Sequence, residues 1–410
     1  MMPSIRPTAI ALLAFALAAC STAPSTPSAR HATVAGAITR APVLLISLDG
    51  FRADYLDLGL TPNLARIAAQ GTRASMFPSY PSLTFPNHYT LVTGLRPDRH
   101  GIIHNTMSDA AIGRFRVADR DAVGDGRWWN GVPIWVTAEQ QGVRTASWAW
   151  PGSTTNIAGT RPSQWKPYDD AVAPSQRIDD VLGWLDQPTS TRPRLVTLYF
   201  EQIDGAGHEY GPDSPQVRAE LAAIDRQIGR LYDTLQQRGQ LDSLNLIVVS
   251  DHGMASVDHK LAVEDMVPMA DATVVADGQS IGIVPKPGRE TAVETRLLGA
   301  HAQYDCWRKS ELPARWHYGR NARVPPIVCQ MHEGWNAVTD NRRVKPGSPG
   351  FDPALPSMRA VFLARGPSFV PGSQLPPFDN VDVYPMLTRV LGLRADDADG
   401  DIGPLLPAMR

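Results

Sequence analysis

The chain has 410 residues, of which 43% are hydrophobic, and a formal net charge of -2. This amount of apolar material is sufficient for one large core, or for one α/β domain that carries insertions. Lysine and arginine are scattered along the chain, which argues against a nucleic-acid-binding surface.

The first residues of the chain have the pattern of an export signal. An arginine at position 6 precedes an apolar run over residues 9–19, and Cys20 follows this run directly. The segment 1–20 resembles a bacterial lipoprotein signal, so we expect Cys20 to be the lipidated first residue of the mature protein. An ordinary cleaved signal peptide is the alternative. The run is too short for a transmembrane helix, which needs about 20 apolar residues.

The residues after Cys20 predict where the protein is located. Residues 21–40 are rich in Ser, Thr, Pro and Ala, a composition typical of a flexible tether. By resemblance to lipoprotein signals, Ser21 directly after the cysteine favours the outer membrane over the inner one. We therefore expect an exported periplasmic protein that touches the outer membrane only through its lipid anchor.

From residue 43 onward, apolar runs typical of buried strands alternate with helical patterns. This alternation predicts an α/β fold, in which a mostly parallel sheet is sandwiched between helices. The predicted strands cover Val43 to Leu48, Val143 to Trp148, Leu195 to Phe200, Leu244 to Val249 and Arg359 to Ala364.

Three helices are predicted between these strands. The first begins at Pro62, because proline suits the first position of a helix, and it ends before Gly71. The second covers residues 174–186. The third is a long amphipathic helix that ends near Gly239, since apolar residues recur at spacings of three and four: Leu221, Ile224, Ile228, Leu231 and Leu235.

Two stretches interrupt the alternation, at about residues 108–135 and 258–356. We interpret both as insertions in one domain that covers residues 41–405. Cys306 and Cys329 lie in the second insertion. Because the chain is expected to reach an oxidising compartment, a disulfide between them is the economical interpretation. A cysteine metal site is the alternative, but neither residue has a second cysteine at short spacing.

Three predicted strands end in acidic residues, namely Asp49 after Leu48, Asp204 after Ile203 and Asp251 after Ser250. The carboxyl ends of parallel strands lie along one edge of a sheet, so we expect these three carboxylates to converge. Because like charges repel each other, a multivalent cation is expected between them.

Histidines accompany two of these carboxylates. His208 lies four residues after Asp204, and His252 directly follows Asp251. Mixed aspartate and histidine ligation suits zinc and favours a transition metal over magnesium. The sequence therefore predicts a zinc site at this edge of the sheet.

Thr84 is the candidate nucleophile. It lies in the sequence PSLTFPNHY (residues 81–89), where a loop gives way to a helical run that reaches Gly94. A hydroxyl at a helix N-terminus faces backbone N–H groups and the positive end of the helix dipole, which favour an alkoxide and a phosphate. A zinc ion beside it would lower the pKa of the hydroxyl further. A simple N-capping role before Pro86 is the alternative.

Four segments carry these residues in the order DGFR (49–52), TFPNH (84–88), DGAGH (204–208) and DHGM (251–254). With them, residues 41–390 closely resemble the nucleotide pyrophosphatase/phosphodiesterase family of the alkaline-phosphatase superfamily, as a bacterial member. The resemblance implies an alkaline-phosphatase-like fold and two zinc ions. It assigns one zinc ion to Asp49, Thr84, Asp251 and His252, and the other to Asp204, His208 and a further histidine near the C-terminal end.

That further histidine is missing from the place where the family has it. Family members usually carry a Gly-x-His-Gly-Tyr/Phe-Asp segment before a Pro-Ser-Met strand, and this chain has Pro349 in the histidine place. Proline cannot ligate a metal, and losing one of three protein ligands weakens a zinc site. His317 and His332 are the candidates to replace it.

The resemblance also assigns residues to the substrate. It implies that the amide of Asn105 binds a phosphoryl oxygen and donates a hydrogen bond to charge that develops in the transition state. It further implies an aromatic slot for a nucleobase at Phe85, Tyr168 and Tyr199. From the residues alone, Asn105 also fits an ordinary turn, and the aromatic residues also fit a core.

The function that the resemblance implies is hydrolysis of nucleotide phosphodiesters or pyrophosphates. Thr84 would attack phosphorus to form a phosphothreonine, which water then hydrolyses, while two zinc ions hold the attacking and leaving oxygens. The substrate is expected to be a small nucleotide or another phosphodiester, such as the choline-bearing lipids that related proteins cleave, and no protein partner is evident.

Two alternatives stay open. One is a phosphomonoesterase of the same superfamily, which would usually need an arginine where this chain has Asn105. The other is a surface lipoprotein that keeps the fold and binds ligands but has weakened catalysis, and Pro349 is the residue that supports it.

Overall fold

The computed structural model describes residues 41–339 and 343–410, and contacts group the chain beyond residue 40 into one compact unit. The predicted export signal with Cys20 and the predicted tether lie outside the described residues. Within the described part, no helix combines the length and the apolar character that crossing a bilayer requires.

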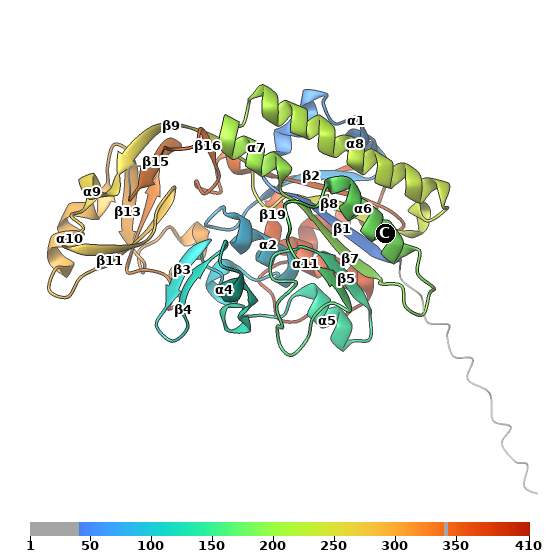
Figure 1. Ribbon diagram of the computed structural model, residues 1–410, viewed down its shortest axis with the longest axis horizontal. Helices are drawn as coiled ribbons and strands as arrows, with labels where there is room; N and C mark the ends of the chain where they lie inside the picture. The colour runs from blue at the N-terminus through green and yellow to red at the C-terminus, as the bar shows by residue number, and fades with distance from the viewer. Residues whose placement is uncertain (1–40, 340–342) are drawn as a thin grey trace, which may run out of the picture. The chain divides into compact units, whose positions relative to one another are not determined.

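A nine-stranded sheet lies at the centre of the described chain (Figure 1). The strand order is β18-β2-β17-β8-β1-β7-β5-β6, and β19 also pairs with β2. Within this sheet only β17 runs antiparallel to its neighbours, β8 and β2, so the predicted, mostly parallel sheet is confirmed. The strands are β1 (Val43–Leu48), β2 (Thr72–Phe77), β5 (Thr145–Trp148), β6 (Gln164–Lys166), β7 (Leu195–Phe200), β8 (Asn245–Val249), β17 (Ala360–Arg365), β18 (Ser373–Gln374) and β19 (Phe378–Asp379).

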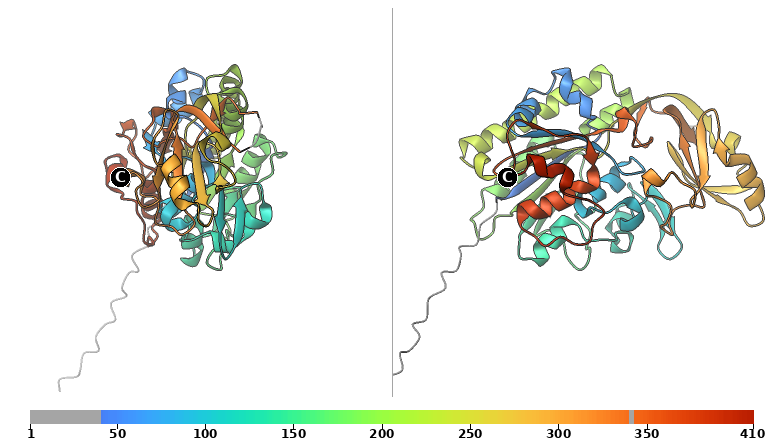
Figure 2. Two further views of the ribbon diagram at one scale, coloured as in Figure 1. Left: turned by 90° about the vertical axis from the view of Figure 1, so that its left-hand side faces the viewer. Right: turned by 180° about the vertical axis from the view of Figure 1, so that it is seen from behind.

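Helices cover both faces of this sheet. Successive strand residues point to opposite faces, so Leu44 and Ile46 pack with one set of helices, and Val43 and Leu45 pack with the other. The first set is α1 (Pro62–Ala69), α6 (Pro174–Leu185) and α8 (Pro215–Gln237). The second set is α2 (Thr84–Thr93), α5 (Ile134–Gln140) and α11 (Val383–Leu391), and the right-hand view of Figure 2 shows α11, in red, across the sheet from the green helix α8.

The predicted strands and helices all occur, with bounds that differ by at most two residues. Strand β2 is not evident from the sequence, because polar Thr72, Arg73 and Ser75 interrupt its apolar residues. Buried and partly exposed residues alternate along this strand, so it contains no continuous apolar run. The antiparallel direction of β17 is not evident from the sequence either, since the direction of a strand depends on partners that are distant in the chain.

Shorter elements connect the sheet to the two interrupted stretches. The first stretch contains a hairpin of β3 (Thr106–Asp109) and β4 (Gly113–Arg116), followed by α4 (Arg120–Gly124). The second contains a five-stranded antiparallel sheet in the order β10-β11-β14-β13-β12 and a three-stranded sheet in the order β15-β9-β16. Its elements are β9 (Ala255–Ala262), α9 (Val263–Met266), β10 (Ala272–Ala276), β11 (Ser280–Pro285), α10 (Glu290–Leu297), β12 (Gly299–Ala300), β13 (Tyr304–Arg308), β14 (Ile327–Met331), β15 (Gly334–Val338) and β16 (Gly347–Ser348).

Cys306 and Cys329 form a disulfide, which confirms the prediction. The two residues lie directly opposite each other on the antiparallel strands β13 and β14. Both are buried in the apolar cluster of the second stretch. The bond therefore cross-links two inner strands of the five-stranded sheet.

Candidate active site

The candidate active site lies where the central strands β1 and β8 end. β1 and β8 pair in parallel, with Ser47 opposite Val249, so the residues that follow the two strands emerge at the same edge of the sheet. Asp49 follows β1, and Asp251 and His252 follow β8. The predicted convergence of these side chains is therefore a consequence of the strand register.

A glycine lets the third carboxylate approach the other two. Gly50 has a φ of 68°, and a Cβ at this position would lie 2.9 Å from the Cα of Asp204. The N–H of Gly50 donates to Asp251 Oδ1 over 3.3 Å. Asp204 does not end a strand as the sequence suggested, because β7 ends at Phe200 and Asp204 lies in the first turn of α7 (Gln202–Tyr210).

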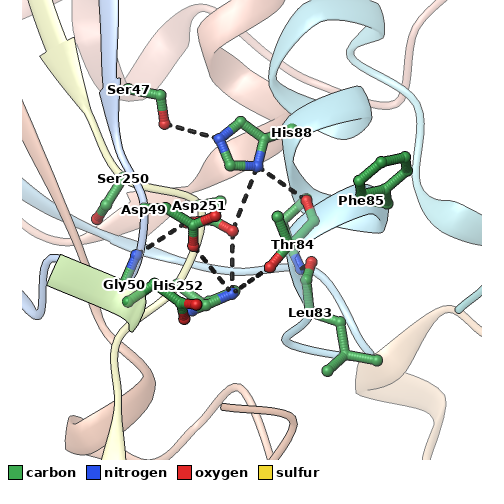
Figure 3. A network of polar contacts seen from close by, with 12 residues as sticks. Ser47, Asp49, Gly50, Leu83, Thr84, Phe85, His88, Ser250, Asp251 and His252 are labelled. Atoms are coloured by element: carbon green, nitrogen blue, oxygen red, sulfur yellow. Dashed lines mark hydrogen bonds and ion pairs between the residues drawn. The ribbon is translucent and has the colours of Figure 1, made fainter. Parts of the chain in front are cut away.

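Side chains from three segments meet at His252 (Figure 3). The Nε2 atom of His252 lies 3.0 Å from Asp251 Oδ2 and 3.6 Å from Asp49 Oδ1. The same atom lies 3.2 Å from the hydroxyl oxygen of Thr84. Asp49, Asp251 and His252 are all at most 1% exposed. The candidate nucleophile thus touches a buried cluster of aspartate and histidine.

The donor atoms of this cluster fit a metal ion. Asp49 Oδ1, Asp204 Oδ1 and Asp251 Oδ2 are buried, and none of them accepts a hydrogen bond within the described chain. Ligand atoms of Asp49, Asp204 and His252 lie within 4.8 Å of one another. Buried charges that are left without a partner are costly, and a cation among these oxygens removes that cost. The mixed carboxylate and imidazole donors favour zinc.

The pKa shifts in the cluster indicate the same need for positive charge. Burial, followed by repulsion from Asp251 and Asp204, raises the pKa of Asp49 well above its usual range. Burial also acts to raise the pKa of Asp251, but His252 and His88 together outweigh it and lower that pKa. Burial acts to lower the pKa of His252, and Asp251 reverses this and raises it. A divalent cation would stabilise both carboxylates in their charged form.

Thr84 is the first residue of α2 and follows Leu83, which occupies the N-cap position. A capping role alone therefore does not account for Thr84. The loop before it is held by Asn87, whose Nδ2 donates to the carbonyl oxygens of Pro81 and Leu83, both at 2.9 Å. These bonds fix the backbone that presents the Thr84 hydroxyl to His252.

His88 belongs to the site, although the sequence analysis assigned it no role. It lies one turn after Thr84 on α2 and is fully buried. Its Nδ1 lies 2.9 Å from the carbonyl oxygen of Thr84 and 3.3 Å from Asp251 Oδ2. Its Nε2 lies 2.8 Å from Ser47 Oγ, as Figure 3 shows. His88 thus connects the nucleophile helix to β1 and to a candidate metal ligand. In the sequence, its position four residues after Thr84 in a predicted helix indicated that it lies on the same face as Thr84.

Asp204 and His208 form the more exposed half of the predicted metal centre. They lie one turn apart on α7, with side chains 17% and 29% exposed, and His208 Nε2 lies 3.6 Å from Asp204 Oδ2. The Nδ1 of His208 contacts the carbonyl oxygen of Gly347 at 2.9 Å, which leaves Nε2 as the ligand atom. Among the described residues, no group of three close ligand atoms includes His208. These residues do not fit a closed second zinc site.

Neither candidate replacement for the missing histidine joins this pair. His332 lies 3.2 Å from Asp305 Oδ2 and 3.2 Å from the carbonyl oxygen of Ala302. His317 is exposed and ends the 3-10 turn Ala314–Trp316. Neither residue belongs to a group of close metal-ligating atoms in the part of the chain that the structure describes.

Asn105 lies beside the nucleophile, as the family resemblance implies. Its side-chain Oδ1 accepts a hydrogen bond of 3.0 Å from the backbone N–H of Phe85, the residue after Thr84. An N–H donor requires the oxygen of the amide on this side, so the orientation of the amide is set. The Nδ2 group is left as the donor for an anion.

Tyr199 has a contact that the sequence analysis did not foresee. Its hydroxyl donates a hydrogen bond of 2.6 Å to Asp49 Oδ2, and the residue is 7% exposed. Its ring centroid lies 6.2 Å from that of Tyr168, which is 43% exposed. Phe85 is partly exposed and packs 6.0 Å from Trp129. Tyr199 therefore orients a candidate metal ligand in addition to its place beside Tyr168.

Comparisons with known proteins agree with this geometry. Residues 43–352 match the type I phosphodiesterase / nucleotide pyrophosphatase family. A pyrophosphatase/phosphodiesterase of Schizosaccharomyces pombe is 36% identical over 394 residues, which cover 91% of this chain and 81% of that protein. A bis(5'-adenosyl)-triphosphatase of Xenopus laevis is 34% identical over 367 residues, which cover 88% and 80%. A venom phosphodiesterase of Crotalus durissus collilineatus is 36% identical, and the match covers 89% of this chain but 46% of that protein.

Solved structures show the same similarity. Murine ectonucleotide pyrophosphatase/phosphodiesterase 5 has a TM-score of 0.86 and 32% identity, with 90% of this chain and 100% of that one covered. An inactive threonine-to-alanine variant of the murine protein, in complex with AMP, has a TM-score of 0.87 and 31% identity. The predicted alkaline-phosphatase-like α/β fold is thereby confirmed. These relatives are eukaryotic, so the bacterial origin stays a prediction. The chain belongs to the type I phosphodiesterase/nucleotide pyrophosphatase family, and it is a hydrolase of phosphoric ester or pyrophosphate bonds.

Proposed function

We propose that this protein hydrolyses nucleotide phosphodiesters or pyrophosphates, with Thr84 as the nucleophile. The observation that carries the proposal is the 3.2 Å contact between Thr84 Oγ1 and His252 Nε2, at the N-terminus of a helix and next to buried, unpartnered carboxylate oxygens. The inactive murine variant lacks a threonine, which is consistent with a threonine nucleophile. A zinc ion held by Asp49, Thr84, Asp251 and His252 would lower the pKa of the hydroxyl and offset charge on phosphate.

Two displacements at phosphorus complete the reaction. Thr84 Oγ1 forms a bond to phosphorus while the bond from phosphorus to the leaving group breaks, which produces a phosphothreonine. Water then attacks the same phosphorus and Thr84 leaves, so the two inversions retain the configuration at phosphorus. Asn105 Nδ2 and the backbone N–H groups at the start of α2 are the donors for the phosphoryl oxygens.

The aromatic rings beside the site and the relatives support a nucleotide as the proposed substrate. Phe85 and Tyr168 offer partly exposed ring faces, with Tyr199 behind Tyr168, and such faces suit a nucleobase. The frog relative is named for hydrolysis of a bis-adenosyl triphosphate, and the murine variant is bound to AMP. We therefore favour nucleotide substrates over lipid phosphodiesters.

A comparison of esters tests the proposed activity. The purified mature protein should hydrolyse bis-p-nitrophenyl phosphate faster than p-nitrophenyl phosphate, and a dinucleoside polyphosphate should release a nucleoside monophosphate. Faster hydrolysis of the monoester would instead support the phosphomonoesterase. No hydrolysis of any of these esters by metal-loaded protein would support the binding lipoprotein.

We also propose that the protein is zinc-dependent, periplasmic and anchored to the outer membrane by lipid on Cys20. Stable anchoring needs two lipid signals, and a multiply acylated cysteine provides them. Cys20→Ser should remove the lipid mass from the mature N-terminus and release the protein from the outer-membrane fraction. A wild-type mature protein that begins after Cys20, without lipid, would instead show an ordinary signal peptide.

A further inference from the structure

We propose that the two halves of the metal centre bind their cations with different strength. Asp49, Asp251 and His252 hold one zinc ion firmly, whereas Asp204 and His208 bind a second divalent cation that exchanges with solvent. This inference rests on the proposed zinc site and deepens it, because it concerns how many metal ions the resting protein keeps. The cause is Pro349, because the family resemblance implies a histidine ligand of the second site at this position.

The two halves of the centre differ in burial. Asp49, Asp251 and His252 have no more than 2% of their side chains exposed. Asp204 and His208 are 17% and 29% exposed. A cation among buried donors has little access to competing water, while a cation at the exposed pair keeps water ligands and dissociates more readily.

The backbone around Pro349 is fixed next to the exposed pair. On one side, the carbonyl oxygen of Gly347 contacts His208 Nδ1 at 2.9 Å. On the other side, the N–H of Gly350 donates to the carbonyl oxygen of Ser82 over 2.9 Å, two residues before Thr84. Residue 349 therefore lies on the short path between the second-site histidine and the nucleophile loop. A ligating side chain would be well placed here, and the proline ring offers no donor atom.

The side chains around this segment do not replace the missing ligand. Ser348 Oγ donates to Gln279 Oε1 over 3.0 Å, so its hydroxyl is engaged away from the metal pair. Within the described residues, the groups of close ligand atoms consist of Asp49, Asp204 and His252, and of Asp49, His88 and Asp251. Asp204 thus also lies close to Asp49 and His252, whereas His208 contacts Asp204 at 3.6 Å and belongs to no such group among the described residues.

This donor set suits a weakly held, hydrated cation. Magnesium usually keeps several waters and binds through one or two carboxylates together with the phosphates of a substrate. The single imidazole also admits manganese or zinc. We therefore infer that the second cation is retained poorly by the resting protein and is held better when a substrate phosphate supplies the remaining ligands.

Metal content tests the inference without any measurement of turnover. The mature protein is loaded with zinc, passed through gel filtration in metal-free buffer and measured for zinc per chain. We expect about one zinc ion in the wild type and about two in Pro349→His, since an added first-coordination ligand should tighten the site by about 10 to 100-fold or more. Pro349→Ala is the matched control for the loss of the proline ring and should stay at about one.

A double variant assigns the gained ion to its site. Adding His208→Ala to Pro349→His should return the zinc content to about one, because the second site then has two ligands again. Two zinc ions retained by the wild type, or one retained by Pro349→His, would overturn the proposal. So would zinc-free wild type after gel filtration. A different result would contradict the proposed activity, namely that protein supplied with zinc and magnesium hydrolyses no phosphate ester.

Discussion

Thr84→Ala is expected to lower kcat for phosphodiesters by about 10⁴-fold or more, the loss that removal of a nucleophile typically causes. The methyl group left in its place cannot form the phosphothreonine. The zinc content should change little, since the proposed ligands Asp49, Asp251 and His252 remain and are buried. Steady-state turnover of bis-p-nitrophenyl phosphate and zinc analysis of the same sample measure both effects.

Thr84→Ser is the matched control for this variant. Serine keeps the hydroxyl at the start of α2 and loses only the methyl group, so we expect it to retain a phosphorylated intermediate and part of the turnover. Turnover by Thr84→Ala within about tenfold of the wild type would show that another group attacks phosphorus, since tenfold corresponds to only about 1.4 kcal/mol of activation free energy.

Asp251→Asn is expected to lower the zinc affinity by more than about 100-fold, beyond the losses that changes outside the ligand shell cause. The amide keeps an oxygen that can accept from Gly50 N–H, but it removes the negative charge and the oxygen that lies 3.0 Å from His252 Nε2. Turnover should fall with the zinc content. Competition with a chelator measures the affinity, and thermal unfolding shows whether the fold is kept.

Asp225→Asn provides a matched control at a buried aspartate outside the site. The carboxylate of Asp225 accepts hydrogen bonds from the backbone of Asn63 and Leu64 at the start of α1. An amide NH₂ there would face a donor, so we expect a loss of about 1–3 kcal/mol in the free energy of unfolding. Its zinc content per folded chain should equal that of the wild type. A zinc loss in Asp225→Asn as large as in Asp251→Asn would mean that Asp251 acts through the fold.

Much of the central sheet was predictable because several of its strands are runs of consecutive buried, mostly apolar residues. β1 and β7 have the predicted bounds, since each is a run of six consecutive buried residues of which five are apolar. β2 was not predicted because only alternate residues are buried. The antiparallel sheet of the second stretch was not predicted either, because its strand pairs join residues that no local pattern connects. The disulfide between Cys306 and Cys329 was an inference from compartment and cysteine number, and the strand register explains it.

The sequence by itself identified the candidate residues for the proposed chemistry. Asp49, Thr84, Asp251 and His252 stand at the ends or starts of recognisable elements, and local chain geometry is enough to place each of them there. It also determined that the side chain of residue 349 cannot ligate a metal, because the proline ring carries no donor atom.

The tertiary structure alone decided how these residues act on one another. The hydrogen bond from Tyr199 to Asp49 and the contacts of His88 with Ser47 and Asp251 join segments that are distant in the chain. The different exposure of the two halves of the proposed metal centre also comes from packing. Burial and distance between side chains depend on the whole fold, because each arises from elements that meet only after the sheet has formed.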